Sequence, residues 1–283
     1  VYRVATGFSG DFGDGWRYNT NFTSSEVDLT RTQNGYLIPQ RIMDVVADGS
    51  FNFSDPLATD PSVWEYISPE NETVSVSRLW LIDANISKDL WDLGGGTMQA
   101  AVGAAYRHES IDAPSGNPAN DSAPYTRYYS VNAVGTAGSR NVTSAYFEID
   151  MPFHEMFDVV ASGRYDDYSS GQSSFSPKVG FLFEPLDTVG LRGTWSQGFR
   201  IPSFNEAFGL PTTGYVNRLV DCETYADFCA QHGNNAYVSN PYSLGLTQTG
   251  DPELDPEESN SFTFGLIWQA TPAILTRRDS PFR

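Results

Sequence analysis

The sequence predicts an all-β protein, an antiparallel up-and-down β-barrel that is incomplete at about nine strands. Apolar and polar residues alternate in many segments, as they do along strands whose side chains point to opposite faces in turn. The connections between these segments mostly alternate between short and long, which is typical of an up-and-down barrel with its long loops at one end. No run of about 18 apolar residues occurs, which excludes a transmembrane helix.

Nine segments carry the strand pattern, and each is about long enough to cross a bilayer when tilted. They lie at residues 1–9, 16–27, 74–88, 97–109, 141–151, 157–168, 174–184, a segment that starts at Thr188, and 259–269. Long polar loops are expected at 28–73, 110–140 and 209–249, and the first of these contains one helical turn around 40–47. Most of the other connections are short turns.

The alternation gives each predicted strand one apolar and one polar face. In the last strand Phe262, Phe264, Leu266 and Trp268 fall on one face, and Ser261, Thr263 and Gly265 on the other. In a soluble protein the apolar face covers a core, whereas in a membrane barrel it faces lipid. The pattern alone leaves both interpretations open. In a barrel we expect the same convex face to carry Phe181, Phe183, Val189, Leu191 and Trp195.

Charge and composition limit the classes of partner. The formal net charge is −18, and Lys88 and Lys178 are the only lysines. Without a basic patch to contact phosphates, nucleic acid is excluded as a partner. The acidic loops either attract cationic or metal-bearing ligands or simply form a solvated surface. Aromatic residues make up 14% of the chain, which suits the aromatic girdles of a membrane barrel and also a lectin-like sandwich.

Two segments identify a family resemblance. GFRIPSFNEAF at 198–208 and GDPELDPEESNSFTFG at 250–265 resemble the late-barrel signature of TonB-dependent outer-membrane receptors. In that family one strand ends in the first motif, a long extracellular loop follows, and the second motif leads into the next strand. The matching positions are Gly198, Phe199, Arg200, Pro202, Ser203, Pro252, Leu254, Pro256 and Glu257.

The resemblance implies a role in energised uptake across the outer membrane of a Gram-negative bacterium. The implied partners are outer-membrane lipid, a TonB-type energising protein that acts through regions absent from this chain, and a small ligand. That ligand is a metal chelate or a saccharide: the classes are iron–siderophore, cobalamin and saccharide. Two alternatives stay open, a passive porin or adhesin-type barrel and a soluble secreted carbohydrate-binding β-sandwich.

The resemblance also gives the expected domain organisation. Residues 1–269 are expected to form part of the barrel domain, since the family barrel has about 22 strands. Residues 270–283 are expected to be a non-barrel tail, because Arg277, Arg278 and Asp279 interrupt any lipid-facing surface. The plug domain of the family is expected to be absent from this chain.

Candidate functional residues cluster in the third long loop. Cys222 and Cys229 are expected to form a local disulfide in an oxidising compartment. Aromatic side chains and an arginine in this loop suit recognition of a chelate or a sugar, although they equally suit packing of the loop on itself. These residues are Tyr215, Arg218, Tyr225, His232, Tyr237 and Tyr242.

The sequence predicts no enzyme, no metal site and no cofactor. His108, His154 and His232 have no metal-ligand spacing, and no GxSxG motif occurs. The carboxylates between 251 and 258 lack the glycine-centred EF-hand pattern.

Overall fold

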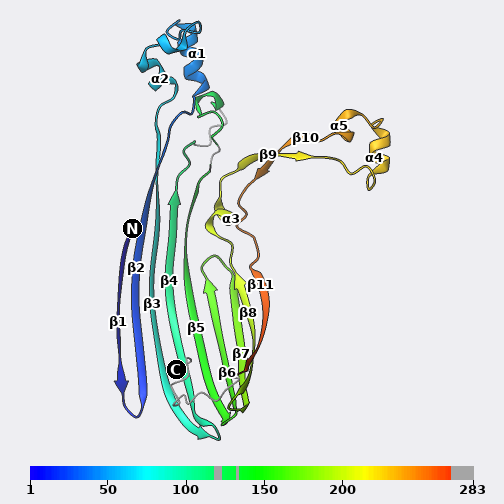
Figure 1. Cartoon of the computed structure of the whole chain (residues 1–283). Coiled ribbons are helices and arrows are strands. Elements are labelled where there is room, and N and C mark those ends of the chain that lie inside the picture. Colours follow the sequence, from blue (N-terminus) through cyan, green and yellow to red (C-terminus); the bar gives the residue numbers. More distant parts are fainter. Residues whose placement is uncertain (118–122, 132–133, 269–283) are drawn as a thin grey trace.

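The computed structural model describes residues 1–117, 123–131 and 134–268. Its main element is a nine-stranded antiparallel sheet in the order β1-β2-β3-β4-β5-β6-β7-β8-β11 (Figure 1). This order confirms the predicted up-and-down meander and excludes a sandwich of two packed Greek-key sheets. The strands are β1 (Tyr2–Phe12), β2 (Trp16–Gln33), β3 (Asn71–Leu93), β4 (Gly96–Ala113), β5 (Thr136–His154), β6 (Phe157–Tyr168), β7 (Ser173–Leu186), β8 (Val189–Arg200) and β11 (Glu257–Trp268).

Short turns lie at one end of the sheet and the long loops at the other (Figure 1). Gly13 and Gly15 have φ angles of 57° and 72° in the turn between β1 and β2. These angles lie in the left-handed region, which glycine adopts without the steric cost of a Cβ. Within the described residues β1 and β11 each pair on one side only, so the sheet is an open barrel wall, as predicted.

Several strands extend further into the loop end than predicted. β2 continues to Gln33 and β3 begins at Asn71, where the sequence predicted a loop between 28 and 73. Gln33 pairs with Asn71 and Arg31 with Thr73, so the ladder continues through polar residues. Apolar alternation marks only the part of a strand that faces lipid, whereas backbone pairing continues where both faces of the ribbon are solvated.

The first long loop forms a small helical cap. α1 (Pro39–Ala47) lies where a helical turn was predicted, and η1 (Pro56–Ala58) and α2 (Pro61–Ile67) follow it. The side chains of Ile38, Val45 and Ile67 are buried between them. The second loop contributes η2 (Pro124–Thr126). None of the helices in the described part of the chain is long and apolar enough to cross a membrane.

The long polar loop predicted at 209–249, together with the segment just before it, forms an arm with secondary structure of its own. It contains α3 (Phe204–Phe208), β9 (Thr212–Arg218), α4 (Ala226–Gln231), α5 (Ala236–Ser239) and β10 (Tyr242–Gln248). β9 and β10 pair only with each other and extend away from the main sheet (Figure 1). Most of their side chains are exposed, so their sequences lack the apolar face that identifies a strand.

Strand register joins the apolar faces into one surface. Phe262 lies opposite Trp195, and Leu266 lies opposite Leu191, which in turn lies opposite Phe183. Residues directly opposite in antiparallel strands share a face, so the predicted common face is confirmed. The same surface continues across β2 to β5 through Tyr18, Ile86, Val102 and Phe147.

Candidate functional site

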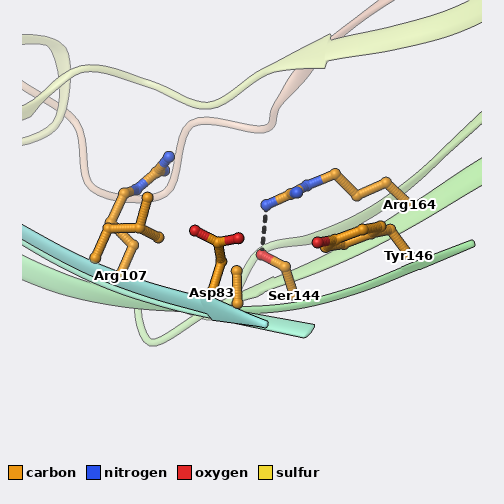
Figure 2. A pocket seen from close by; sticks show the side chains of 7 residues that line it. Asp83, Arg107, Ser144, Tyr146 and Arg164 are labelled. Atoms are coloured by element: carbon orange, nitrogen blue, oxygen red, sulfur yellow. Dashed lines mark hydrogen bonds between the residues drawn. The ribbon is translucent and has the colours of Figure 1, made fainter. Parts of the chain in front are cut away.

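Polar side chains from four neighbouring strands gather on the concave face of the sheet (Figure 2). The register brings them together, because Asp83 lies opposite Ala105, which lies opposite Ser144. They surround a shallow pocket of about 190 Å³. Ligand pockets typically measure ~300–1,000 Å³, so this wall supplies one side of a larger site. The lining residues are Leu81, Asp83, Ala105, Arg107, Ser144, Tyr146 and Arg164.

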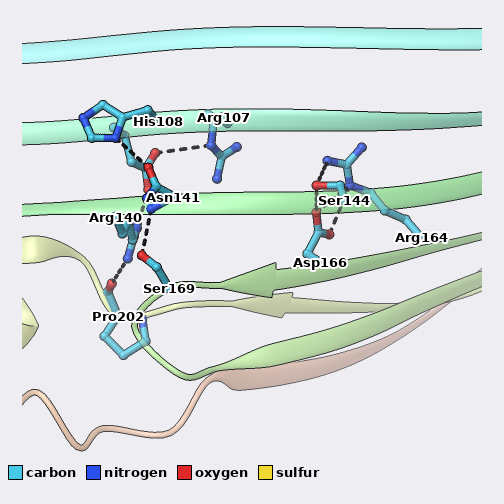
Figure 3. Close-up of polar contacts among 10 residues, drawn as sticks. Arg107, His108, Arg140, Asn141, Ser144, Arg164, Asp166, Ser169 and Pro202 are labelled. Carbon is cyan, nitrogen blue, oxygen red and sulfur yellow. Dashed lines mark hydrogen bonds and ion pairs between the residues drawn. The ribbon is translucent and has the colours of Figure 1, made fainter.

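Arg164 is held rigidly at this wall (Figures 2 and 3). Its Nε donates to both carboxylate oxygens of Asp166, at 2.9 and 3.0 Å, and its Nη2 donates to Ser144 Oγ at 2.8 Å. The guanidinium carbon lies 5.6 Å from the centre of the Tyr146 ring. Asp166 and Ser144 are buried, so this network fixes the arginine before any ligand arrives.

Arg107 and Asp83 leave hydrogen-bonding capacity at the same pocket. The buried Nε of Arg107 has no hydrogen-bond partner in the described residues, although it lies 3.4 Å from Glu109 Oε2. Asp83 accepts a bond from Asn21 Nδ2 at 3.3 Å and forms no ion pair within the described ranges. The carboxylate of Asp83 therefore keeps acceptor capacity at the wall, whereas the unpartnered Nε of Arg107 is buried within it.

Arg140 links the wall to the loop above it (Figure 3). Its Nε donates to Glu109 Oε1, and its Nη1 donates to the carbonyl oxygen of Pro202 at 2.8 Å. Its guanidinium carbon also lies 4.7 Å from the ring centre of Phe204 and 5.7 Å from that of Tyr168. One side chain thus connects β4, β5 and β6 to the segment that follows β8.

The two predicted signature segments meet at the loop end of β8 and β11. Arg200 and Glu257 are opposite each other in the ladder, and Arg200 Nη2 lies 2.7 Å from Glu257 Oε1. The same guanidinium donates to both oxygens of Glu206, at 2.8 and 3.0 Å. Ser203 caps α3 and forms a capping box with Glu206. The signature residues therefore close the base of the arm.

The electrostatics of this closure appear most clearly at Glu206. Hydrogen bonds from Arg200, and then from the backbone and side chain of Ser203, lower the pKa of Glu206 from 4.5 to about 2. The carboxylate is fully ionised at neutral pH and accepts bonds that fix the start of α3.

The structure disperses the six loop residues along the arm. Arg218 and Tyr242 lie directly opposite each other in the β9–β10 hairpin. Tyr215 and Tyr237 are among the most exposed side chains of the chain, and His232 packs on the ring of Phe228, 4.3 Å away. None of the six lines the pocket on the concave wall. Their role in ligand binding stays a prediction.

Cys222 and Cys229, for which a disulfide was predicted, are joined at the tip of the arm, with 5.8 Å between their Cα atoms. Among the described residues no group of three His, Cys, Asp or Glu side chains is placed to hold a metal ion. The three histidines lie apart: His108 Nδ1 is 2.7 Å from Asn141 Oδ1, His154 Nδ1 accepts from the Met156 backbone, and His232 Nδ1 contacts Phe228.

Comparison with known proteins identifies the class. The chain is part of an outer-membrane-type β-barrel: the family described as TonB dependent receptor-like, beta-barrel matches residues 2–276. The chain belongs to that family, whose members are receptors and transporters of the Gram-negative outer membrane rather than enzymes. No curated protein matches it.

Solved structures share the fold. The siderophore receptor PirA from Acinetobacter baumannii is 17% identical with a TM-score of 0.59, over 94% of this chain and 32% of that chain. A mutant of the ferric enterobactin receptor PfeA from Pseudomonas aeruginosa is 11% identical with a TM-score of 0.60, over 94% and 32%. Another PfeA mutant, in complex with enterobactin, is 12% identical with a TM-score of 0.59, over 94% and 32%. This chain spans about a third of the length of these receptors.

Sequence reasoning missed most of the concave wall as a site. Alternation within a strand shows that Arg107 and Arg164 lie on polar faces, but it does not show which strands place them together. That depends on register, which is set by the turns between strands. The predicted domain division at 269 and 270 also stays a prediction, because the tail lies outside the described residues.

Proposed function

We propose that this chain forms one wall of an outer-membrane receptor that binds a ferric siderophore and imports it. Import would be energised from the inner membrane through a TonB-type protein, with outer-membrane lipid around the convex face. The observation that carries the proposal is the arginine-bearing concave wall in a barrel of this family. Guanidinium groups recognise oxygen-rich anions through directed hydrogen bonds, and Arg164 is fixed in advance for such contacts.

The related structures favour iron–siderophore over cobalamin or saccharide as the ligand. PirA is named as a siderophore receptor, and one PfeA structure is a complex with enterobactin.

The test is uptake of radioactive iron bound to siderophores by a strain that lacks the gene encoding this chain. Restoring the gene should restore energised uptake of at least one ferric siderophore. Arg164→Met should reduce that uptake roughly tenfold, because it removes charge-assisted hydrogen bonds at the wall. Arg78→Met is the matched control. Arg78 also forms an ion pair, with its cross-strand neighbour Glu26, but both side chains lie on the face of the sheet that is opposite to the concave wall.

Three outcomes would overturn the proposal. Uptake that continues after the proton-motive force is collapsed would indicate a passive porin. Growth that depends on the gene only with cobalamin or a saccharide would assign the other ligand classes. Equal uptake by the Arg164→Met and Arg78→Met strains, at equal surface levels of both proteins, would remove the wall from the mechanism.

A further inference from the structure

A second pocket lies above the concave wall, between the α3 segment and the turn that joins β6 to β7. It measures about 220 Å³, and Phe204, Phe208 and Arg140 are among its lining residues. The two pockets share no lining residue, since Arg107 lines the first and Arg140 lines the second. A single carboxylate, that of Glu109, connects them.

Glu109 contacts both arginines. Its Oε2 lies 3.4 Å from Arg107 Nε, and its Oε1 accepts a hydrogen bond from Arg140 Nε. Strand register causes this, because Arg107 and Glu109 share one face of β4 and Glu109 lies opposite Arg140 on β5. The side chains of Glu109 and Arg140 are mostly buried and that of Arg107 is 33% exposed, so solvent screens these charges only in part. One carboxylate thus serves two guanidinium groups that repel each other.

Arg140 in turn holds the start of α3. Its Nη1 donates to the carbonyl oxygen of Pro202 at 2.8 Å (Figure 3), and its guanidinium carbon lies 4.7 Å from the centre of the Phe204 ring. Pro202 and Phe204 flank Ser203, whose side chain caps the helix. The position of Arg140 therefore decides how firmly the start of α3 is held.

We infer that Glu109 is a positioning residue through which an anionic group bound to Arg107 tightens the hold of Arg140 on α3. Without a further anion, Glu109 is divided between two cations. An anion on Arg107 leaves Glu109 to Arg140 alone and offsets the repulsion between the two guanidinium groups. Arg140 then stays at Pro202 and Phe204 for a larger fraction of the time. The identity of that anion as a ferric siderophore rests on the proposed function, whereas the coupling between the two arginines does not.

The experiment measures amide hydrogen exchange of residues 203–209 in the full-length receptor, purified in detergent without any ligand. Arg107→Met removes the charge that a bound anion would neutralise, and it should slow this exchange about three- to tenfold. Damage to packing speeds exchange, so a merely structural role of Arg107 predicts the opposite sign. Arg107→Lys keeps the positive charge and should exchange as the unaltered protein does.

Two further variants locate the coupling. In an Arg140→Met background, Arg107→Met should no longer change the exchange, because the link to Pro202 is absent. Glu109→Gln removes the shared carboxylate and should speed the exchange, which keeps the inference testable if Arg107→Met folds poorly.

Arg164→Met is the matched control. Arg164 lines the same pocket as Arg107, but it bonds to Asp166 and Ser144 and not to Glu109, so its loss should leave the exchange of residues 203–209 unchanged.

The inference is overturned if Arg107→Met leaves the exchange unchanged or speeds it, if it slows the exchange equally in the Arg140→Met background, or if Arg164→Met has the same effect. Unchanged exchange in Glu109→Gln overturns it as well. Neither a siderophore nor uptake is involved, so this failure leaves the proposed function standing, and a failure of iron uptake leaves the coupling standing.

Discussion

At the residue scale, Arg200 holds two carboxylates where the arm leaves the sheet. Glu206 comes from α3 and Glu257 from the start of β11, so one guanidinium fixes both ends of a 50-residue excursion. This explains why the two signature segments occur as a pair in the sequence: each supplies part of the same closure.

Acid should open this closure. The pKa of Glu206 is lowered from 4.5 to about 2, so the stabilisation is fully present above pH 4.5 and is lost as the pH falls through about 2. We expect amide hydrogen exchange of residues 203–209, corrected for intrinsic rates, to accelerate within that window. Glu206→Gln should exchange rapidly at every pH, whereas Glu253→Gln, on the same arm, should behave normally. A Glu206→Gln variant that keeps the pH-dependent step would contradict this role.

Arg140 should contribute more to stability than an exposed arginine. Its side chain is 16% exposed and that of Glu109 is 18% exposed. Arg140→Met should lower the free energy of unfolding by about 2 kcal/mol, measured by urea titration in lipid vesicles. Arg17→Met is the control, because Arg17 and Asp89 are about half exposed, and it should cost about 0–1 kcal/mol. Equal losses in the two variants would show that the links to Pro202 and Phe204 contribute nothing.

At the element scale, the disulfide should act only on the tip of the arm. Cys222 and Cys229 are seven residues apart, and both lie in the segment around α4. Mass spectrometry of the exported protein without reductant should find no free thiols. The double change Cys222→Ser, Cys229→Ser should speed proteolysis between 220 and 240 and leave unfolding of the sheet unchanged. A lowered stability of the sheet would show that the arm supports it.

The nine strands of the sheet were predictable and the two strands of the arm were not. A strand between lipid and a polar lumen must alternate, so Phe262 to Trp268 shows its structure directly in the sequence. Most residues of β9 and β10 are exposed to solvent, so these strands need backbone hydrogen bonds but no apolar face. The α2 helix is intermediate, since Asp60 and Pro61 are a helix start signal within a segment that otherwise looks irregular.

The candidate site was less predictable than the fold. Three arginines of the concave side, Arg107, Arg140 and Arg164, come from β4, β5 and β6, and strand register decides which residues surround them. Arg140 depends in addition on the backbone carbonyl group of Pro202. The sequence does not show which backbone carbonyl group will accept a hydrogen bond from Arg140. Sequence reasoning instead chose aromatic residues in the arm, because exposed tyrosines are a visible compositional signal.

At the scale of the whole molecule, the sheet is a wall with opposite chemistry on its two sides. Away from the bulges near the short turns, paired residues keep a common face from strand to strand, so Asp83, Ser144 and Asp166 lie on the same side with Ala105 between the first two. The concave side carries part-buried ion pairs such as that of the half-exposed Arg164 with the buried Asp166. The convex side carries large apolar side chains that no described residue covers, including Phe264 and Leu266. A bilayer is the solvent that fits this surface.

The last prediction tests that assignment at two positions of one strand. Leu266 and Thr263 lie on opposite faces of β11, three residues apart, so they differ mainly in the face they occupy. Leu266→Arg places a charge in hydrocarbon, which costs about 2–4 kcal/mol at the midplane of the bilayer and about 0–1 kcal/mol near its interfaces. Leu266 lies opposite Leu191, close to the short-turn end of β8 and β11, so we expect a cost between these limits. Thr263→Arg faces a water-filled lumen and should cost less than about 1 kcal/mol.

The measurement is the free energy of folding into lipid vesicles by urea titration, with assembly in cells followed by the heat-dependent gel shift of folded barrels. A soluble protein would also lose stability on Leu266→Arg, so the lipid dependence decides. In vesicles with shorter acyl chains the hydrocarbon layer is thinner, and the penalty at Leu266 should shrink as the charge comes nearer to the interface. The penalty at Thr263 should stay constant. A loss at Leu266 that does not change with bilayer thickness would mean that protein, and not lipid, covers the convex face.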